Sequence, residues 1–312
     1  MITIRSISTT ETAQFVALGD ADDVLEQLEA TWKAESSRPE WTLVAEVDGT
    51  PIARGALIAE PMGGGVATLE GTAAFLWADF DHPEHGDAFR ALVDALADRL
   101  APHGPTTLDR RLNPELHGDV EPMRRLLEAS GFTLLQEKEG FAWTPSVEPP
   151  PQPAPLRLET LASIGPDEFC RVMAATTAGT LDRNDRYYIG RCGAEPWAAE
   201  MMTAVGEGDE HSWLLGYHGD EPAGFVAVGG FDERTWTIVH IGVVPEHRGH
   251  GHVHELLAGA DGAARARSFT AGLSDVDVVN EPMRAAMRRA GHRTDLRPWH
   301  VWHYRRDVGR AP

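Results

Sequence analysis

Apolar residues recur along this chain with two different periods, which together predict an α/β fold with a mixed sheet. Within 42–60, two runs rich in β-forming residues flank Asp48-Gly49, which is the arrangement of a β-hairpin. Within 87–100, apolar residues recur every three or four positions, as they do on one face of a helix. Segments of both kinds alternate to the end of the chain, which is typical of α/β domains.

The predicted elements follow one order in each half of the chain. The first half is predicted to hold strands at 1–7, at 42–60 (two strands), at 67–78 and up to Trp143, with helices at 20–35, 87–100 and 122–129. The second is predicted to hold strands at 156–158, 213–217, 223–228, 235–244, 269–277 and 299–304, with helices at 166–175, 196–205, after the loop at 245–251 and from 281. We therefore expect two domains of one plan, closed by Trp143 and Trp302 respectively.

A duplication is visible in the letters as well as in the order. The sequence EPMR at 121–124 and again at 281–284 is followed by a glycine after the same interval. Between the halves, residues 146–155 contain five prolines, which predicts an extended polyproline II linker. The expected domains are therefore 1–145 and 156–312, joined by that linker.

The stretch from Thr235 to Leu257 carries the most specific signal. It reads as a strand that Pro245 ends, a loop with two glycines, and then a helix. The start of a helix offers unpaired N–H groups and the positive end of its dipole, which suits a pyrophosphate. The letters at 243–251, V-V-P-E-H-R-G-H-G, resemble the acetyl-coenzyme A loop of the GNAT (Gcn5-related) N-acetyltransferases.

This resemblance implies acetyl-coenzyme A (acetyl-CoA) as the acyl donor. In that family the strand before the loop splays from its neighbour and pairs with the pantetheine arm. The positions carried over as coenzyme-binding are Val243, Val244, Arg248, Gly249, His250, Gly251, His252, Val253, Asn280 and Met287. Two of them depart from the family pattern, because Val253 stands where Gly or Ala is usual and Met287 where a Tyr often protonates the leaving thiolate.

The first half lacks this loop, although the residues before it are similar. Pro-Glu-His at 83–85 mirrors Pro-Glu-His at 245–247, but Gly-Asp-Ala-Phe follows it instead of Arg-Gly-His-Gly. Asp87 would direct a carboxylate at a polyanion, and Phe89 would crowd it. We therefore predict a degenerate GNAT-like first domain and a catalytic GNAT second domain.

His240 is the titratable side chain of the strand before the loop, and its ordinary pKa of ~6.5 suits a general base. A structural histidine, held in the sheet by a hydrogen bond, is the alternative interpretation. Asp277 and Tyr187 complete the predicted catalytic set. Solvent, His250, or a residue from elsewhere such as Tyr187 or Tyr188 would then supply the proton that Met287 cannot.

Residues 180–197 would lie over the acceptor in the GNAT fold. They combine carboxylates with aromatic rings, a combination that holds cationic amines. The predicted substrate-binding residues are Asp182, Asp185, Tyr188, Glu195 and Trp197. The same letters also fit a polar loop followed by a helix cap.

The net charge of −20 restricts the partners of the protein. Residues 1–150 hold 26 Asp and Glu against 11 Lys and Arg, so nucleic acid is not expected and cationic acceptors are favoured. There is no apolar run of ~18 residues and no signal-peptide pattern at the start, so we expect no membrane partner and a cytoplasmic location.

Cysteine and histidine usage completes the picture. Cys170 and Cys192 have no metal or redox spacing and read as free thiols. Histidines 247, 250, 252 and 254 lack a carboxylate or cysteine that would complete a metal spacing, so no metal is expected. The excess of Arg over Lys, with much Ala and Gly, indicates a GC-rich bacterial genome.

These inferences converge on an acetyl-CoA-dependent N-acetyltransferase that acts on the amine of a small molecule, as a monomer or homodimer. Two alternatives stay open. Val253 and Met287 allow an acyl-CoA-binding regulatory protein without turnover, and the tandem layout also resembles mycothiol synthase, an acetyltransferase.

Overall fold

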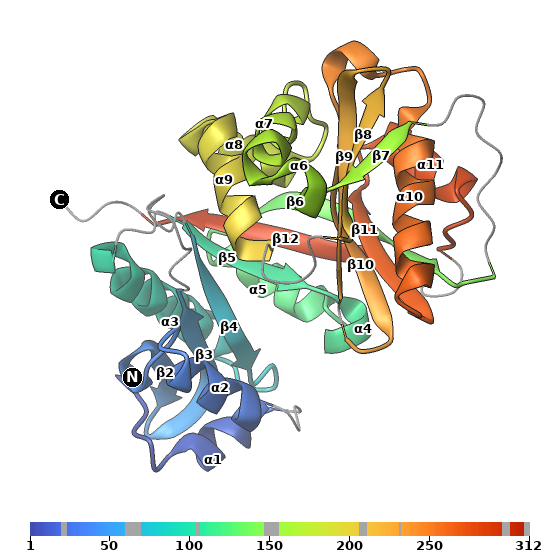
Figure 1. Ribbon diagram of the computed structural model, residues 1–312. Helices are drawn as coiled ribbons and strands as arrows, with labels where there is room; N and C mark the ends of the chain where they lie inside the picture. Colours follow the sequence, from blue (N-terminus) through green and yellow to red (C-terminus); the bar gives the residue numbers. More distant parts are fainter. Residues whose placement is uncertain are drawn as a thin grey trace. The chain divides into compact units, whose positions relative to one another are not determined.

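The computed structural model describes residues 1–19, 24–59, 70–103, 107–146, 156–205, 211–230, 232–294 and 300–308 (Figure 1). It divides into two compact units. Unit 1 comprises Met1–Leu135 and Trp302–Pro312, and unit 2 comprises Gln136–Val301. The proline-rich linker predicted at 146–155 falls, apart from Ser146, outside the described residues.

The two halves of the sequence exchange their last strands, so the halves do not coincide with the two units. Strand β6 (Thr133–Trp143) pairs antiparallel with β11 (Ala271–Asp277) of unit 2. Strand β12 (His300–Asp307) pairs antiparallel with β5 (Thr107–Leu112) of unit 1. The prediction that each half is closed by its own last strand is therefore wrong. The letters of the last strand of each half do not identify the sheet that the strand joins.

Unit 1 is a mixed sheet covered by helices. Its strands follow the order β1 (Ile2–Ser6), β2 (Thr42–Val47), β3 (Thr50–Ile58), β4 (Glu70–Ala78), β5 and β12. Its helices are α1 (Thr12–Val16), α2 (Val24–Lys33), α3 (His85–Leu100), α4 (Pro114–His117) and α5 (Glu121–Ala129), with 3₁₀ turns at Pro39–Trp41 and Ala101–His103. Leu43 packs in one core with Leu92 of α3, whereas Val44 packs in another with Leu28 of α2. Alternate residues of β2 thus face opposite helical layers.

Unit 2 repeats this plan. Its strands follow the order β6, β11, β10 (Thr235–Val243), β9 (Glu221–Gly230), β8 (Trp213–His218) and β7 (Arg157–Thr160). Its helices are α6 (Leu161–Ile164), α7 (Pro166–Thr176), α8 (Arg183–Cys192), α9 (Ala194–Val205), α10 (His252–Ala266) and α11 (Glu281–Arg289), with a 3₁₀ turn at Pro245–His247.

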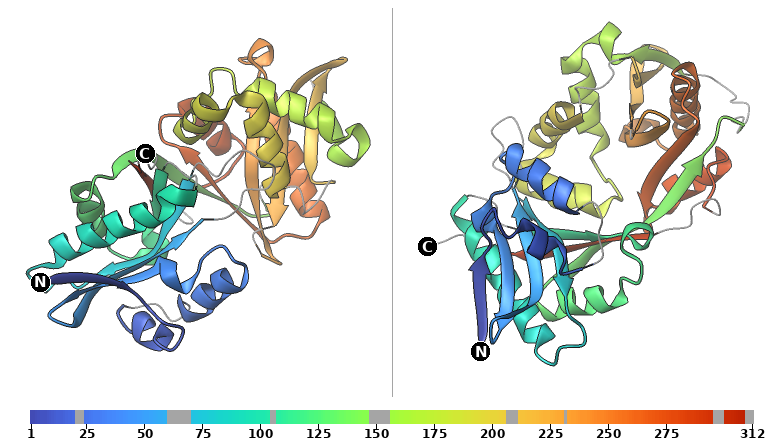
Figure 2. Two further views of the ribbon diagram at one scale, coloured as in Figure 1. Left: turned by 90° about the vertical axis from the view of Figure 1, so that its left-hand side faces the viewer. Right: turned by 90° about the horizontal axis from the view of Figure 1, so that it is seen from below.

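Helices cover both faces of the sheet of unit 2, with α7 to α9 on one side and α10 and α11 on the other (Figures 1 and 2). Leu215 packs with Phe169 of α7, and its neighbour Leu214 packs with Leu256 of α10. Within the described residues, none of the helices is apolar over a length that would reach across a bilayer.

Most predicted elements are confirmed within a few residues. The hairpin turns at Asp48 (φ 50°) and Gly49 (φ 84°), as the Asp-Gly pair predicts. Strand β5 and helix α8 were not predicted from the sequence, and none of the residues of α8 is fully buried. Asp182 caps α8 by accepting hydrogen bonds from the N–H groups of Asn184 and Asp185.

Candidate functional site

The centre of unit 2 is an opening between two parallel strands. Strands β10 and β11 pair only at Thr235–Ala271 and Trp236–Gly272 and then diverge. A cavity of about 130 Å³ lies in the opening, lined by β10 and β11, by β6, by the end of α7, by the start of α8 and by α11. The unpaired edge of β10 therefore faces a space that a ligand can enter.

His240 lies on this edge, directly after a β-bulge. The pairing of β10 with β9 shifts register between Ile238 and His240, which re-aims the side chain. The imidazole stacks on Phe225 at 5.6 Å between ring centroids and meets the edge of Trp197 at 5.0 Å. Burial lowers the pKa of His240 to about 4, against the smaller opposite effect of the Asp182 charge. At neutral pH the ring is therefore uncharged, and one of its nitrogens can accept a hydrogen bond.

Asp185 is the acidic neighbour of His240 in the cavity wall. Its Oδ2 lies 3.6 Å from His240 Nε2, longer than a hydrogen bond. Burial and the charge of nearby Asp182 raise the pKa of Asp185 well above its ordinary value. Two titratable groups with opposite pKa shifts thus face each other, which is a common arrangement at sites of proton transfer.

Asp277 also lines the cavity, but both of its oxygens accept bonds from the protein. Arg183 Nη2 donates to Oδ1 at 2.7 Å, and Gln136 Nε2 and the Arg183 N–H each donate to Oδ2 at 3.0 Å. Burial alone would raise the pKa of Asp277, and these hydrogen bonds together lower it. In this geometry Asp277 fixes the start of α8 to the end of β11.

Strand β6, from the first half of the sequence, contributes one residue to the cavity wall and another to the hydrogen bonds of the wall's carboxylates. Gln136 is buried and bridges Asp277 and Asp182, with Nε2 at 2.8 Å from Asp182 Oδ2. Lys138 lines the cavity and forms an ion pair with Asp275. Neither residue was predicted from the sequence, because nothing in the letters shows that β6 joins β11. For Lys138, the rarity of lysine in the chain was the only available signal.

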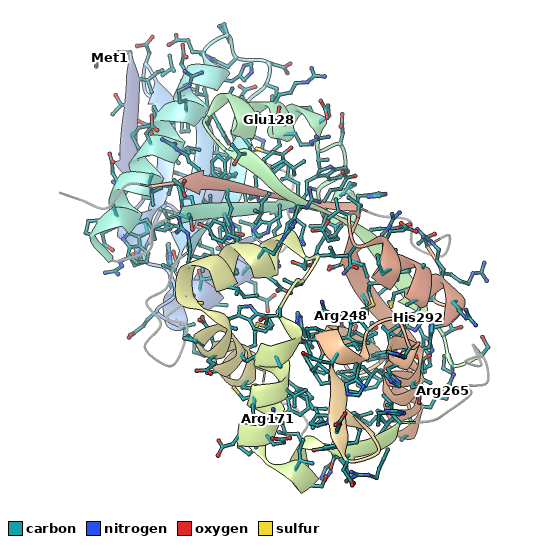
Figure 3. All side chains as sticks on the ribbon, turned by 90° about the horizontal axis from the view of Figure 1, so that it is seen from above. Met1, Glu128, Arg171, Arg248, Arg265 and His292 are labelled. Atoms are coloured by element: carbon teal, nitrogen blue, oxygen red, sulfur yellow. The ribbon has the colours of Figure 1, made fainter. Side chains whose placement is uncertain are left out.

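The glycine loop that follows β10 has the backbone that the letters predict. Gly249 (φ 81°) and Gly251 (φ 87°) are left-handed, and a Cβ built on either would meet no atom within 4 Å. Gly251 precedes α10, whose first-turn N–H groups lack helical partners. Arg248 braces the loop, because Nε donates to the carbonyl of Val243 at 3.0 Å and Nη2 to that of Thr176 at 2.9 Å (Figure 3).

The other predicted coenzyme residues divide between loop and core. Asn280 caps α11 by accepting from the Met283 N–H at 3.3 Å, as expected, and lines the cavity with Met287. Val243 pairs opposite Gly224, and Val244 is buried with its N–H bonded to Ala223. Val253 packs in the same cluster as Met287, and His250 is exposed. The side chain of His252 turns inward to Glu255 at 3.1 Å, which leaves only its backbone for the loop.

The predicted acceptor-side residues fall into two groups. Asp182 and Asp185 line the cavity. Trp197 is buried behind His240, and Tyr188 packs on the core formed with α7. Among the described residues, neither Tyr187 nor Glu195 belongs to the cavity wall; the guanidinium of Arg191 lies over the Tyr187 ring at 4.6 Å, and Glu195 is exposed on α9.

Comparison with known proteins finds a family model that matches the region around this site. Residues 180–292 match the family model for the acetyltransferase (GNAT) family. The whole chain is similar to a GCN5-related N-acetyltransferase from Sphaerobacter thermophilus, with a TM-score of 0.62 at 16% identity over 98% of this chain and 96% of that one.

Two further solved structures extend the likeness over both units. A tandem GNAT protein from the clavulanic acid biosynthesis pathway has a TM-score of 0.55 at 17% identity, with 100% of both chains covered. A GCN5-related N-acetyltransferase from Kribbella flavida has a TM-score of 0.56 at 17% identity, with 91% of this chain and 93% of that chain covered. At these identities the likeness is one of fold, and it confirms the predicted α/β fold of two tandem GNAT-like domains. No curated protein sequence matches the chain.

Proposed function

We propose that the protein transfers the acetyl group of acetyl-CoA to the amine of a small molecule, because residues 180–292 match the family model of the acetyltransferase (GNAT) family. The observation that carries this proposal is the opening between β10 and β11. There, the Asp185–His240 pair faces a free strand edge that leads directly into the glycine loop.

The residues around this opening fit the donor. Acetyl-CoA would supply an activated acetyl group as its thioester. The edge of β10 up to Val243 offers backbone groups to a pantetheine arm, and the N–H groups of 249–253 offer donors to a pyrophosphate. Gly249 and Gly251 leave open space above the loop, and Val253 packs toward α11 and so leaves that space free.

The Asp185–His240 pair handles the proton of the acceptor amine. An alkylammonium must lose one proton before its nitrogen can attack a thioester carbon. The carboxylate of Asp185 accepts this proton, because its raised pKa makes it a stronger base than an ordinary carboxylate. Neutral His240 accepts a hydrogen bond from the same nitrogen and orients it. As the C–N bond formed and the C–S bond broke, the nitrogen would lose its second proton to solvent. The sulfur would leave as a thiolate and take its proton from solvent, since Met287 cannot donate one.

The charges in the cavity favour a cationic acceptor. Arg183 neutralises Asp277 and Lys138 neutralises Asp275. Asp182, in contrast, accepts only from amide groups, and Asp185 faces an uncharged imidazole. The acceptor is therefore a polar amine such as an amino sugar, a polyamine or an amino-acid derivative.

The test is release of free thiol. The protein is incubated with acetyl-CoA and a panel of such amines, and free thiol is measured beside the mass of the acetylated product. We expect equal amounts of both for at least one cationic amine, and loss of both in His240→Ala. Coenzyme binding in a calorimeter without thiol release for any amine would instead indicate an acyl-CoA-binding protein without turnover.

A further inference from the structure

Three histidines of unit 2 come together outside the cavity, from three separate elements. His218 ends β8, His247 lies in the 3₁₀ turn after β10, and His252 opens α10. One ring nitrogen of each lies within 4.8 Å of the others. The centroid of the His218 ring lies 5.8 Å from that of the His247 ring and 5.2 Å from that of the His252 ring. We propose that His218, His247 and His252 bind one divalent transition-metal ion, with Zn²⁺ as the ion that suits the site best.

The spacing needs only a small closure to become a coordination shell. Zinc–nitrogen bonds are about 2.0–2.1 Å long, whereas an ion centred in a triangle with 4.8 Å sides would lie about 2.8 Å from each corner. Each ring must therefore move by at most about 0.7 Å, which side-chain torsions provide. Imidazole nitrogens are suitable ligands for Zn²⁺, Ni²⁺ and Cu²⁺ and unsuitable for Mg²⁺ or Ca²⁺.

His252 already has the environment of a metal ligand. Its Nδ1 lies 3.1 Å from Glu255 Oε1, and a carboxylate can only accept, so Nδ1 carries the proton and Nε2 keeps its lone pair. A carboxylate behind the imidazole is the partner that metal-bound histidines usually have. Glu255 is itself buried and accepts from the Leu156 N–H, so this orientation is fixed before any ion arrives.

The two other ligands lie on firmly placed backbone and in negative surroundings. His218 pairs with Glu221 across the turn between β8 and β9, and Glu221 Oε2 lies 3.5 Å from His247 Nε2, where it can serve as a fourth ligand or orient the ring. The cation between His247 and His252 in sequence, Arg248, is bonded to the carbonyls of Val243 and Thr176. The positive charge of Arg248 is therefore held by these two carbonyls, whereas the carboxylate of Glu221 lies beside the three imidazoles.

The sequence alone gave no reason to expect this site. From the letters, neighbouring histidines of a glycine loop are expected to point in different directions, and the turn between β8 and β9 is distant along the chain. A bound ion would join that turn to the loop and to α10. This inference does not depend on acetyl transfer.

The test uses the full-length protein after treatment with a chelator. Calorimetric titration with Zn²⁺ should saturate at one ion per chain, and Co²⁺ should give the visible bands of a tetrahedral complex. His218→Ala changes only an exposed residue at the end of β8. It should weaken Zn²⁺ binding by more than ~100-fold, which exceeds the usual loss of metal affinity when an outer-shell partner is removed. His247→Ala should do the same.

His250→Ala is the matched control. Its ring lies 6.0 Å from that of His252, but His250 is exposed and outside the group of three, so Zn²⁺ affinity should stay unchanged. Equal loss in His250→Ala and His218→Ala, or no stoichiometric binding by the unaltered protein, would overturn the proposal. Circular dichroism of each variant shows that the fold is retained before binding is compared.

Discussion

The two units place a helix after a matching strand, yet only unit 2 has two left-handed glycines in the loop between them. Before α10, Gly249 and Gly251 adopt left-handed conformations that turn N–H groups outward. Before α3, the chain enters the helix from Glu84 at φ −93°, and Gly86 lies inside the helix. The His85 ring and the Glu84 N–H bond to His82, which occupies groups that the other loop leaves available. The two loops therefore differ in backbone conformation although they share the strand–loop–helix order, and we expect phosphate binding only in unit 2.

The acceptor sides of the two units differ in the same sense. Unit 2 keeps a cavity beside His240. In unit 1 the buried Arg54 guanidinium extends into the matching layer and donates to the carbonyls of Phe15 and Val16, and burial lowers its pKa to about 10. Because its guanidinium donates to these two carbonyls, Arg54 fills space in the interior and stabilises α1. Unit 1 therefore has hydrogen bonds from a buried arginine, whereas unit 2 has a cavity beside His240.

The strand exchange offers the largest effect. A fragment of residues 156–312 lacks β6, which leaves β11 without its antiparallel partner, the cavity without Lys138, and Asp277 without the hydrogen bond from Gln136. We expect this fragment to be insoluble or unfolded by circular dichroism, since an unpaired strand edge promotes aggregation. Its co-expression with residues 1–155 should restore a soluble, active complex. A soluble and active fragment alone would show that β6 is dispensable to unit 2.

Gly251→Asp should abolish binding of acetyl-CoA. The substitution brings a carboxylate to the loop, and two like charges at about 4 Å repel by about 4 kcal/mol near a protein surface, which corresponds to about a thousandfold in affinity. Calorimetry should give one site per chain for the unaltered protein and none for the variant. Gly251→Asn, with the same shape and no charge, should retain much of the affinity, because Asn tolerates a left-handed backbone.

The matched change in unit 1 sharpens this contrast. Asp87 lies in the first turn of α3, where its carboxylate complements the helix dipole. Asp87→Gly should therefore cost some stability of unit 1 and leave coenzyme binding unchanged. A second, equivalent coenzyme site in Asp87→Gly would mean that one charge alone separates the two loops.

Local features were predictable from the sequence, and tertiary ones were not. The hairpin at Asp48-Gly49, the glycine loop and the Asn280 cap follow from short-range backbone chemistry, so their letters sufficed. The positions of β6 and β12 depend on which sheet buries them, and that choice depends on residues distant in the sequence. The low pKa of His240 also escaped prediction, because it arises from burial against Phe225 and Trp197.

The Asp185–His240 pair gives the next effect and sets the pH dependence. Asp185→Asn and His240→Ala should each lower kcat by about 100-fold, with the Kd of acetyl-CoA changed by less than about twofold. Asp185 accepts a proton only when ionised, and its pKa is raised, so kcat/KM should rise with pH through that pKa and then level off. His240, with a pKa of about 4, is neutral above about pH 5 and adds no further limb.

Asp185→Asn distinguishes this assignment from a purely structural pair. Its residual rate should lose the rising limb, because the titrating base has been removed, whereas a structural role would lower the rate at all pH values and leave the profile in place. Unchanged turnover of His240→Ala across pH would assign that histidine to the packing of β10 alone.

The smallest expected effect concerns the charge of the acceptor. Asp182→Asn preserves the cap of α8, because the amide oxygen still accepts from the N–H groups of Asn184 and Asp185, and it removes one negative charge from the cavity. KM for a cationic amine should rise about fivefold, the equivalent of about 1 kcal/mol for one partly screened charge. In the unaltered protein, KM should also rise as salt approaches ~1 M, where the Debye length falls to ~3 Å. Saturation by an acidic amine at a lower concentration than by any cationic one, without salt dependence, would show that the acidic residues serve only the fold of α8 and β11 and select no substrate.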